Sequence, residues 1–466
     1  MPNNLRSLTG LDAAFLYLEA AGTPMHVGSV MLLEVPRRRS YDFRRELISL
    51  VEERLPRAAA LRRVLHEAPF ELGHPLWHEA TTLDLDTHII RQRLPAPGTP
   101  QQLWRLIGEL HAQPLPRDRP LWQFSVIEGL ASGEVALYTK IHHALLDGQG
   151  GIALGQALLD AQPTPPAPRG ARKPHASAAP ATRDLAGASL RASVQQFAKL
   201  ARAVPATIKL AGGAALGARG LLNKIRGALA PRTPFNAQLG AQRSFAAVSL
   251  PLAAAKKVAR HFSVSLNDLV LALCASALRD WLRRRKALPA QPLIAALPVS
   301  LRAAGDSEVN NQVSMVQCAL ATDIADPVQR LQAIAAGTAT LKRQVATVRN
   351  LIPTDFPGLA APLWATALSR LWAGARVAER VPPLANVAIS NVPGPPIPLY
   401  LAGTRVVHYY PVSIVTHGLG LNITVNSYAG MLEFGLVACR DIVPKPEVLA
   451  KGLAAALDAL MLQMHK

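Results

Sequence analysis

Apolar and polar residues alternate along short segments of this chain and follow a helical period along longer ones. Alternation with a period of two is typical of strands, and apolar residues three and four positions apart are typical of amphipathic helices. Strands are predicted at residues 29–34, 120–127, 134–141, 292–301, 313–320, 386–390, 404–415, 421–427 and 432–438. Helices are predicted at residues 8–21, 42–55, 100–112, 265 onward, 327–348, 359–378 and 445 onward. Both halves of the chain therefore mix helices and strands, as in an α/β fold.

A proline-rich segment separates the two halves. Residues 162–183 contain six prolines and can sustain neither a helix nor a central strand, so we predict an exposed linker there. A chain of 466 residues also exceeds a single hydrophobic core. We therefore expect an N-terminal domain at 1–160, a connecting segment at 161–243 and a C-terminal domain at 244–466.

Positive charge gathers in the connecting segment. The chain has a formal net charge of +19, and residues 161–243 hold thirteen Lys and Arg against a single acid, Asp184. After the linker, apolar residues from Leu190 to Val204 share one helical face, while basic side chains lie on the other. This pattern predicts a basic amphipathic stretch, 185–232, that meets an anionic membrane or lipid-body surface. The alternative is a connector helix packed on its own core, and we expect no nucleic-acid partner.

The rest of the sequence indicates a cytoplasmic protein without a transmembrane helix. Residues 406–432 lack Lys, Arg, Asp and Glu and are long enough to span a bilayer, but they contain histidine, proline and asparagine and largely alternate near their end. The three cysteines are scattered, which favours a reduced compartment. The first residues lack the apolar core of a secretory signal. We therefore expect a cytoplasmic protein whose membrane contact is peripheral.

Two adjacent histidines, His142 and His143, follow the predicted strand 134–141, and Asp147 and Gly148 come shortly after them. If the strand continues into the motif, the histidines face opposite ways, so that one enters a cleft while the other is buried as scaffold. Neutral histidine suits general-base work near pH 7. Asp147 is suited to anchor the loop, and Gly148 lets the chain turn tightly. The alternative is a packed histidine pair with a helix-capping aspartate.

Other catalytic patterns are missing from the sequence. Neighbouring strand residues cannot easily grip one metal ion, and no third ligand stands at chelating spacing. The chain has no G-x-S-x-G nucleophile elbow and no P-loop. The glycines at 148 and 150 are followed by Ala153, where a dinucleotide fingerprint needs glycine. These absences argue against a metal site, an ordinary serine hydrolase and a dinucleotide-binding enzyme.

The histidine motif is part of a wider resemblance. His142-His143-Ala-Leu-Leu-Asp147-Gly148 matches HHxxxDG, the motif of the CoA-dependent acyltransferase superfamily, which includes chloramphenicol acetyltransferase and peptide-synthetase condensation domains. Further motifs are LDAAF at 11–15, PMHVG at 24–28, PLW at 120–122, ND at 267–268, PVSLR at 298–302, NQVS at 311–314, ISNVPGP at 389–395 and LNITV at 421–425. Together they resemble the bacterial wax ester synthase/diacylglycerol acyltransferase family over nearly the whole chain outside the linker.

The resemblance implies a fold of two chloramphenicol-acetyltransferase-like domains, each a mixed sheet with helices, with the histidines in a tunnel between the domains. It implies an acyl-CoA-dependent O-acyltransferase that makes triacylglycerol from diacylglycerol, or wax ester from a fatty alcohol. Acyl-CoA is then a co-substrate, and no permanently bound cofactor and no metal are implied. His143 is the implied base, which takes the proton from the acceptor hydroxyl in a direct transfer without an acyl-enzyme.

The resemblance also assigns supporting roles. His142 and Gly148 belong to the same motif as the base, and Asp147 has a structural role. Arg302 is the candidate ion-pair partner of Asp147 by analogy with the superfamily. Asn267 is a candidate support of the site from the second domain, although a helix N-cap explains it equally well.

Two other functions remain open from the sequence. A condensation-type acyltransferase would use a donor bound to a carrier protein, and a non-catalytic protein would bind a lipid body or membrane through its basic segment. The narrower family motifs count against the first, and the intact histidine motif counts against the second. His26 and His417 are additional pocket candidates, whose alternative is a hydrogen bond to local backbone groups.

Overall fold

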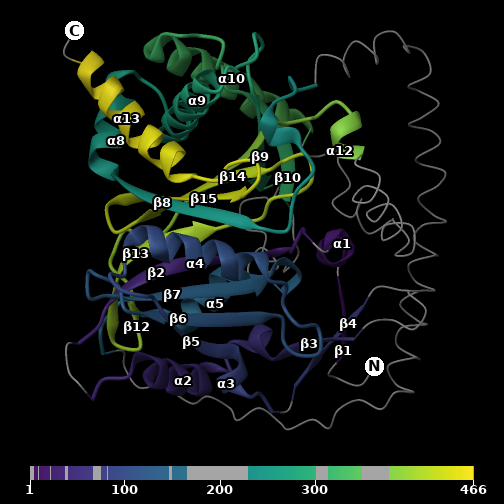
Figure 1. Ribbon diagram of the computed structural model, residues 1–466, viewed down its shortest axis with the longest axis vertical. Helices are drawn as coiled ribbons and strands as arrows, with labels where there is room; N and C mark the ends of the chain where they lie inside the picture. Colours follow the sequence, from purple (N-terminus) through teal and green to yellow (C-terminus); the bar gives the residue numbers. More distant parts are fainter. Residues whose placement is uncertain are drawn as a thin grey trace, which may run out of the picture.

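The computed structural model consists of two stacked halves, each built on a six-stranded sheet (Figure 1). It describes residues 5–8, 10–20, 22–36, 40–66, 75–80, 82–145, 150–164, 229–300, 313–348 and 377–464. Most of the predicted linker and of the predicted helix at 359–378 lies outside these residues, as does the predicted basic helix.

The N-terminal sheet carries the histidine motif on a central strand. Its strand order is β12-β13-β2-β7-β6-β5, and all pairs are antiparallel except β6 with β5. The strands are β2 (His26–Glu34), β5 (Ile89–Arg93), β6 (Trp122–Glu128), β7 (Val135–His142), β12 (Tyr400–Leu401) and β13 (Thr404–Val412). Every residue of β7 is buried, so the strand places its last residue, a histidine, inside the molecule.

Both faces of this sheet are covered. One face packs on α1 (Gly10–Leu18), α2 (Phe43–Arg54) and α5 (Gly150–Leu158), and the other on α4 (Pro100–Ala112) and on the second sheet. The short elements of this half are β1 (Leu5–Ser7), β3 (Arg63–His66), β4 (Leu76–Glu79) and α3 (Leu85–His88), of which the three strands form a small antiparallel sheet. The alternate side chains of β7 therefore enter two different cores.

The C-terminal sheet is also mixed. Its order is β10-β9-β11-β14-β15-β8, with parallel pairing of β11 with β9 and β14. The strands are β8 (Arg243–Pro251), β9 (Ile294–Ser300), β10 (Val313–Ala319), β11 (Val387–Val392), β14 (Leu421–Tyr428) and β15 (Met431–Cys439). The helices of this half are α8 (Leu252–His261), α9 (Leu266–Arg284), α10 (Pro327–Val348), α12 (Val377–Arg380) and α13 (Glu447–Gln463).

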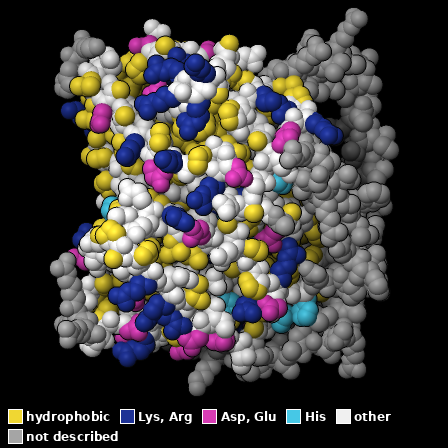
Figure 2. Space-filling model, in the orientation of Figure 1, with side chains coloured by type: hydrophobic (Ala, Val, Ile, Leu, Met, Phe, Trp, Pro, Cys, Tyr) yellow, Lys and Arg dark blue, Asp and Glu magenta, His cyan; other side chains and the backbone are white. Residues whose placement is uncertain are grey.

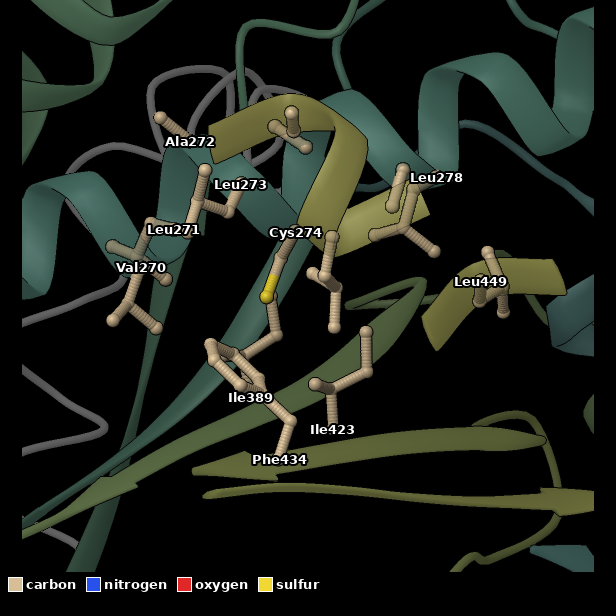
Figure 3. Close-up of a cluster of buried hydrophobic side chains, with 14 of the residues drawn as sticks. Val270, Leu271, Ala272, Leu273, Cys274, Leu278, Ile389, Ile423, Phe434 and Leu449 are labelled. Atoms are coloured by element: carbon tan, nitrogen blue, oxygen red, sulfur yellow. The ribbon is translucent and has the colours of Figure 1, made fainter. Parts of the chain in front are cut away.

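Helix α9 forms the centre of the C-terminal core. Its side chain Cys274 points toward Ile389, Ile423 and Phe434 of the sheet (Figure 3), and all four residues are at most 2 % exposed. Each fully buried aliphatic or aromatic side chain of this kind contributes about 1.5–3 kcal/mol relative to exposure. The core is therefore large enough to hold this half together around one helix.

Local sequence explains where several helices begin. Thr99 and Gln102 form a capping box before α4, and the helix starts at Pro100, where a missing N–H costs nothing. Ser265 and Asp268 form the same motif before α9. The predicted helices 100–112 and 327–348 match α4 and α10 at both ends.

The two halves meet through close backbone approaches. Helix α4 packs on β8, and a Cβ atom at Gly108 would lie 2.6 Å from the carbonyl oxygen of Arg243. Strand β13 packs on β15, and a Cβ atom at Gly435 would lie 1.7 Å from the carbonyl oxygen of Pro411. Any other side chain at Gly435 would push the sheets apart, so this glycine permits the contact.

The N-terminal sheet contains strands from both predicted domains. Strands β12 and β13, the yellow-green strands of the lower half in Figure 1, come from the 244–466 segment but extend the sheet of the 1–160 segment. Because hydrophobic alternation predicts a strand without its partners, the sequence did not indicate this exchange. The prediction of two α/β units with mixed sheets is confirmed, and their boundaries stay a prediction.

Among the described residues, no single helix is long and apolar enough to cross a membrane. Helices α8 and α9 pass the test of length and composition only as a pair, and they meet at an angle of 100°. Most of α9 is buried in the C-terminal core.

Candidate active site

His142 ends β7, and hydrogen bonds hold its backbone N–H and its ring atom Nδ1. Its backbone N–H donates to the carbonyl of Leu121 at 2.9 Å, and its Nδ1 accepts the N–H of Ala144 at 3.1 Å. Because Nδ1 accepts, the neutral ring carries its proton on Nε2. That atom lies 3.4 Å from Oε1 of Glu19, and the side chain is only 1 % exposed. His142 is therefore a buried scaffold residue.

His143 begins a short 3-10 turn, His143–Leu145, instead of continuing the strand. Its backbone N–H donates to the carbonyl of Met25 at 2.8 Å. Its ring stacks on Phe15 of α1, with 3.8 Å between centroids and 17° between planes. Nδ1 of His143 is buried and makes no hydrogen bond within the described part of the chain. The turn, and not strand alternation as predicted, sets the two histidines apart.

The surroundings keep the His143 imidazole neutral. Burial lowers the pKa of His143 to about 4, a contact with its own backbone opposes this shift, and the neighbouring His142 adds to it. At pH 7 the ring therefore has a free electron pair that can accept a proton. Neutrality is the protonation state that a general base requires.

Glu19 supplies the negative charge next to the histidine pair. Burial tends to raise the pKa of Glu19, but the contacts with His142, the N–H of Met25 and Arg117 outweigh this and hold the pKa at about 2. Oε1 accepts the Met25 N–H at 3.1 Å, and Oε2 accepts a hydrogen bond from Arg117 at 3.0 Å. Sequence reasoning missed Glu19, because an acid just after a helix is usually a surface residue.

A second group of buried polar side chains extends along the same face of β7. His26 lies opposite His142 in the strand register, and its Nε2 donates to the carbonyl of His111 at 2.7 Å. Nδ1 of His111 lies 2.7 Å from the Tyr138 hydroxyl, and its Nε2 lies 2.9 Å from the carbonyl of Ser413. Burial lowers the pKa of His111 to about 3, although the Ser413 carbonyl opposes this. These residues form structural support behind the histidine pair.

Lys140 belongs to the same face, two residues before His142. Its Nζ donates to the carbonyls of Leu110 at 3.0 Å and Gln113 at 3.1 Å, at the C-terminal end of α4. Burial lowers the pKa of Lys140 to about 8. The ammonium group satisfies carbonyls that the helix end leaves without partners. Sequence alternation placed Lys140 on the face of His142 but gave no sign of its burial.

The remaining predicted residues fall into two groups. Asp147, Gly148 and Arg302 lie outside the described residues. Asn267 lies in the first turn of α9 and accepts a hydrogen bond from Asn391 at 3.2 Å. The N-cap of this helix is Ser265, so the N-cap alternative for Asn267 is wrong.

His417 makes a hydrogen bond to a backbone group, which is the alternative to a role in the pocket. Its Nδ1 accepts the backbone N–H of Leu239 at 3.1 Å, and burial lowers its pKa. Within the described ranges, no three His, Cys, Asp or Glu side chains are arranged to hold a metal ion.

The chain folds as two mixed sheets, with a histidine pair where a central strand of one of them ends. The first condensation domain of the calcium-dependent antibiotic synthetase aligns over 98 % of this chain and 97 % of that chain, with a TM-score of 0.55 and 15 % identity. This likeness concerns the fold alone. The wax ester synthase/diacylglycerol acyltransferase from Marinobacter aquaeolei VT8 aligns over 99 % of this chain and 100 % of that chain, with a TM-score of 0.71 and 29 % identity.

Sequence comparison gives the family. Residues 8–270 match the wax ester synthase/diacylglycerol acyltransferase catalytic domain, and residues 309–461 match the WS/DGAT C-terminal domain. The chain belongs to this family and is an acyltransferase. It is 38 % identical to a Mycobacterium tuberculosis protein named as a diacylglycerol O-acyltransferase, over 97 % of this chain and 99 % of that protein. A second relative from that organism, named tgs2, is 37 % identical over 96 % of this chain and 97 % of its own length. The predicted family and enzyme class are confirmed.

Proposed function

We propose that the protein transfers a long-chain acyl group from acyl-CoA to the hydroxyl of diacylglycerol or of a fatty alcohol, with His143 as the general base. The observation that carries this proposal is the neutral His143 ring, held by a backbone hydrogen bond and by stacking on Phe15. The names of the relatives support the choice of diacylglycerol, and the name of the family supports both acceptors.

The reaction needs a base that takes the proton of the acceptor hydroxyl and later gives a proton to the leaving thiolate of CoA. His143 takes the proton of the acceptor hydroxyl while its oxygen attacks the thioester carbonyl. The tetrahedral intermediate then collapses, the carbon–sulfur bond breaks, and the thiolate of CoA takes the proton from the His143 imidazolium. The ester and free CoA leave, and His143 is neutral again. A neutral resting base is consistent with this cycle, because each turnover begins and ends in that state.

The cysteines of the chain support direct transfer without an acyl-enzyme. All three are buried: Cys274, Cys318 and Cys439. Burial raises the pKa of Cys274 to about 12 and that of Cys318 to about 11, so neither is a thiolate at neutral pH. Acyl-CoA therefore acts as a co-substrate in this proposal, and no permanently bound cofactor takes part.

Further roles are proposed from the family motif. Asp147 and Gly148 shape the loop after the histidines, Asp147 pairs with Arg302, and Asn267 supports the site from the C-terminal half. His142, buried and bonded to Ala144 and Glu19, holds the loop from its other side. In this proposal the substrates meet the histidines in a tunnel between the two halves.

We also place the protein in the cytoplasm, attached to the surface of a membrane or lipid body. The stretch 185–232 is the main contact in this proposal, because residues 161–243 carry thirteen Lys and Arg and a single acid. In Figure 2, further basic side chains gather over the helices at the top of the C-terminal half. Exposed basic residues on α8 and at the end of α9 include Lys256, Lys257 and Arg284. Anionic lipid therefore suits both regions.

The proposal is tested with purified protein, palmitoyl-CoA and either diacylglycerol or hexadecanol, by measuring free CoA and product lipid. His143→Ala should abolish turnover while the protein stays folded. The matched control is His261→Ala, which removes an exposed histidine on α8 and should leave turnover unchanged. Retained turnover in the His143 variant would refute its role as the base.

A further inference from the structure

The end of α1 and the residue that follows it contact both histidines. The N–H of Glu19 donates to the carbonyl of Phe15 at 3.2 Å, so the two residues lie one turn apart on the same side of the helix. The ring of Phe15 stacks on His143 at 3.8 Å, and Oε1 of Glu19 lies 3.4 Å from Nε2 of His142. One helical turn therefore presents an aromatic face to one histidine and a carboxylate to the other.

Glu19 also reaches the His143 backbone through a single residue, Met25. The N–H of Met25 donates to Oε1 of Glu19 at 3.1 Å, and the carbonyl of Met25 accepts the N–H of His143 at 2.8 Å. Met25 is 2 % exposed, so its backbone is held inside the protein. A shift of the Glu19 carboxylate would move the strand start that holds His143.

The carboxylate itself is held firmly. Oε2 of Glu19 accepts from Arg117, whose guanidinium also donates to the carbonyl of Leu16 at 3.2 Å. The Glu19 side chain is 9 % exposed. Its oxygens thus face protein groups, and we assign it no direct contact with a substrate.

The hydrogen-bond pattern around His142 depends on this carboxylate. Nδ1 of His142 accepts the N–H of Ala144, which leaves the proton on Nε2, and Nε2 faces Glu19. An acceptor at this place adds to the preference for the Nε2–H tautomer that the Ala144 N–H creates at Nδ1, whereas a donor or an apolar group at the Glu19 position would weaken that preference.

We propose that Glu19 is a positioning residue for acyl transfer: together with the Ala144 N–H it stabilises the Nε2–H tautomer of His142 and, through the backbone of Met25, it holds His143 at the angle at which Phe15 stacks on its ring. This inference rests on the assignment of His143 as the base. Small displacements of a catalytic group cost a large part of the rate, so Glu19 affects kcat and leaves the KM values nearly unchanged.

Two substitutions of Glu19 separate its contacts. Glu19→Ala removes all of them and should lower kcat about 100-fold, with KM within about twofold. Glu19→Gln keeps an oxygen for Met25 and His142 but turns an N–H group toward Arg117, and should lower kcat about 10-fold. Glu109→Gln is the matched control, because Glu109 forms an exposed ion pair with Arg105, and it should behave as wild type.

A second readout needs no turnover. In protein with ¹⁵N-labelled histidine, ring ¹⁵N shifts distinguish the two neutral tautomers, and His142→Gln identifies the signal of His142. The wild type should show the Nε2–H form, Glu19→Gln should keep it, and Glu19→Ala should show a mixture. Circular dichroism checks whether each variant is folded. If Glu19→Ala does not fold, the kinetic test uses Glu19→Gln.

The outcomes distinguish this inference from the proposed function. Wild-type kcat in the Glu19 variants, or a rise in KM that accounts for the whole loss, would overturn the inference even if His143→Ala is inactive. An unchanged His142 tautomer in folded Glu19→Ala would also overturn it. Activity in His143→Ala would instead refute the base, and the tautomer measurement would still decide whether Glu19 orients His142.

Discussion

His408 on β13 and Glu433 on β15 join the two sheets, with 2.9 Å between Nδ1 and Oε1. Glu433 is fully buried, and its second oxygen accepts a hydrogen bond from Ser249 of β8. The Ser249 hydroxyl also lies 2.9 Å from that of Tyr410. Four polar side chains thus connect the halves, next to an apolar cluster to which α4, β8 and β13 contribute.

His408→Leu should destabilise the protein at pH 7. The change leaves the Glu433 carboxylate buried with Ser249 as its remaining neighbour in this group, and an uncompensated buried charge is costly. Because the His408 side chain is 30 % exposed, we expect a loss of about 2–4 kcal/mol in the free energy of unfolding, measured by urea denaturation. The double variant with Glu433→Gln should be more stable than His408→Leu alone; equal stability would contradict the argument.

The same contact predicts a pH dependence. The hydrogen bond to Glu433 raises the pKa of His408 above 6.5, although burial opposes the shift. A raised pKa in the folded state gives stability that is fully present below pH 6.5 and is lost as the pH rises through the raised value. The stability difference between wild type and His408→Leu should therefore shrink in alkaline buffer, and a constant difference would exclude this ion pair as its cause.

Phe15 should determine the pH below which kcat/KM falls. Burial holds the pKa of His143 at about 4, so kcat/KM of the wild type should stay level from pH 8 down to about pH 5. Phe15→Ala opens one face of the ring, raises the pKa toward 6.5 and makes kcat/KM fall between pH 7 and pH 5. Phe262→Ala, in the other half, should keep the wild-type profile. A wild-type acid limb near pH 6.5 would contradict the burial of His143.

Buried neutral histidines should make the protein sensitive to acid. Burial lowers the pKa of His26, His88, His111 and His143 in the folded state. A lowered folded pKa means that stability is present above pH 6.5 and declines as the pH falls toward the folded value. Each such group contributes up to about 1.4 kcal/mol per pH unit in this window. Urea titrations from pH 7.5 to pH 5 should show the decline.

His111 offers a direct check of how steeply the free energy of unfolding falls as the pH falls. His111→Gln removes one buried ring of the group, 2 % exposed, and should make the free energy of unfolding depend less steeply on pH by up to about 1.4 kcal/mol per pH unit, even if it lowers stability at every pH. An unchanged slope would mean that His111 does not titrate on unfolding.

Gly435→Ala should weaken the contact between the sheets. The added methyl group would lie 1.7 Å from the carbonyl oxygen of Pro411, so β15 and β13 must separate. We expect the free energy of unfolding, measured by thermal or urea denaturation, to fall by about 1–3 kcal/mol or more. Gly337→Ala is the matched control, because nothing lies within 4 Å of its Cβ position inside α10, and alanine there should stabilise by up to about 1 kcal/mol.

The basic stretch 185–232 should bind anionic vesicles. Replacing its Lys and Arg by Gln should abolish cosedimentation with phosphatidylserine-containing vesicles, and raising the salt concentration should weaken the binding of the wild type. Vesicles of phosphatidylcholine alone serve as the control. Equal binding by the neutralised variant would leave the stretch as a packed connector.

Local sequence signals predicted most of the elements, and long-range contacts account for what they missed. Thr99 with Pro100 set the start of α4, and alternation located β7 and β15 within one residue of each end. The motif pointed to His142 and His143. It could not indicate Glu19 or His111, because their importance comes from burial beside residues far away in the sequence. It also gave no indication that His143 leaves the strand.

The exchange of β13 has a consequence for synthesis of the chain on the ribosome. Strand β2 ends at Glu34, and its second neighbour in the sheet begins only at Thr404. A nascent chain therefore carries β2 with one edge unpaired until nearly all of the protein has been translated, and such an edge invites pairing with other chains. Truncated chains that end before residue 404 should aggregate, because the sheet that carries His142 gains strand β13 only in the last part of translation.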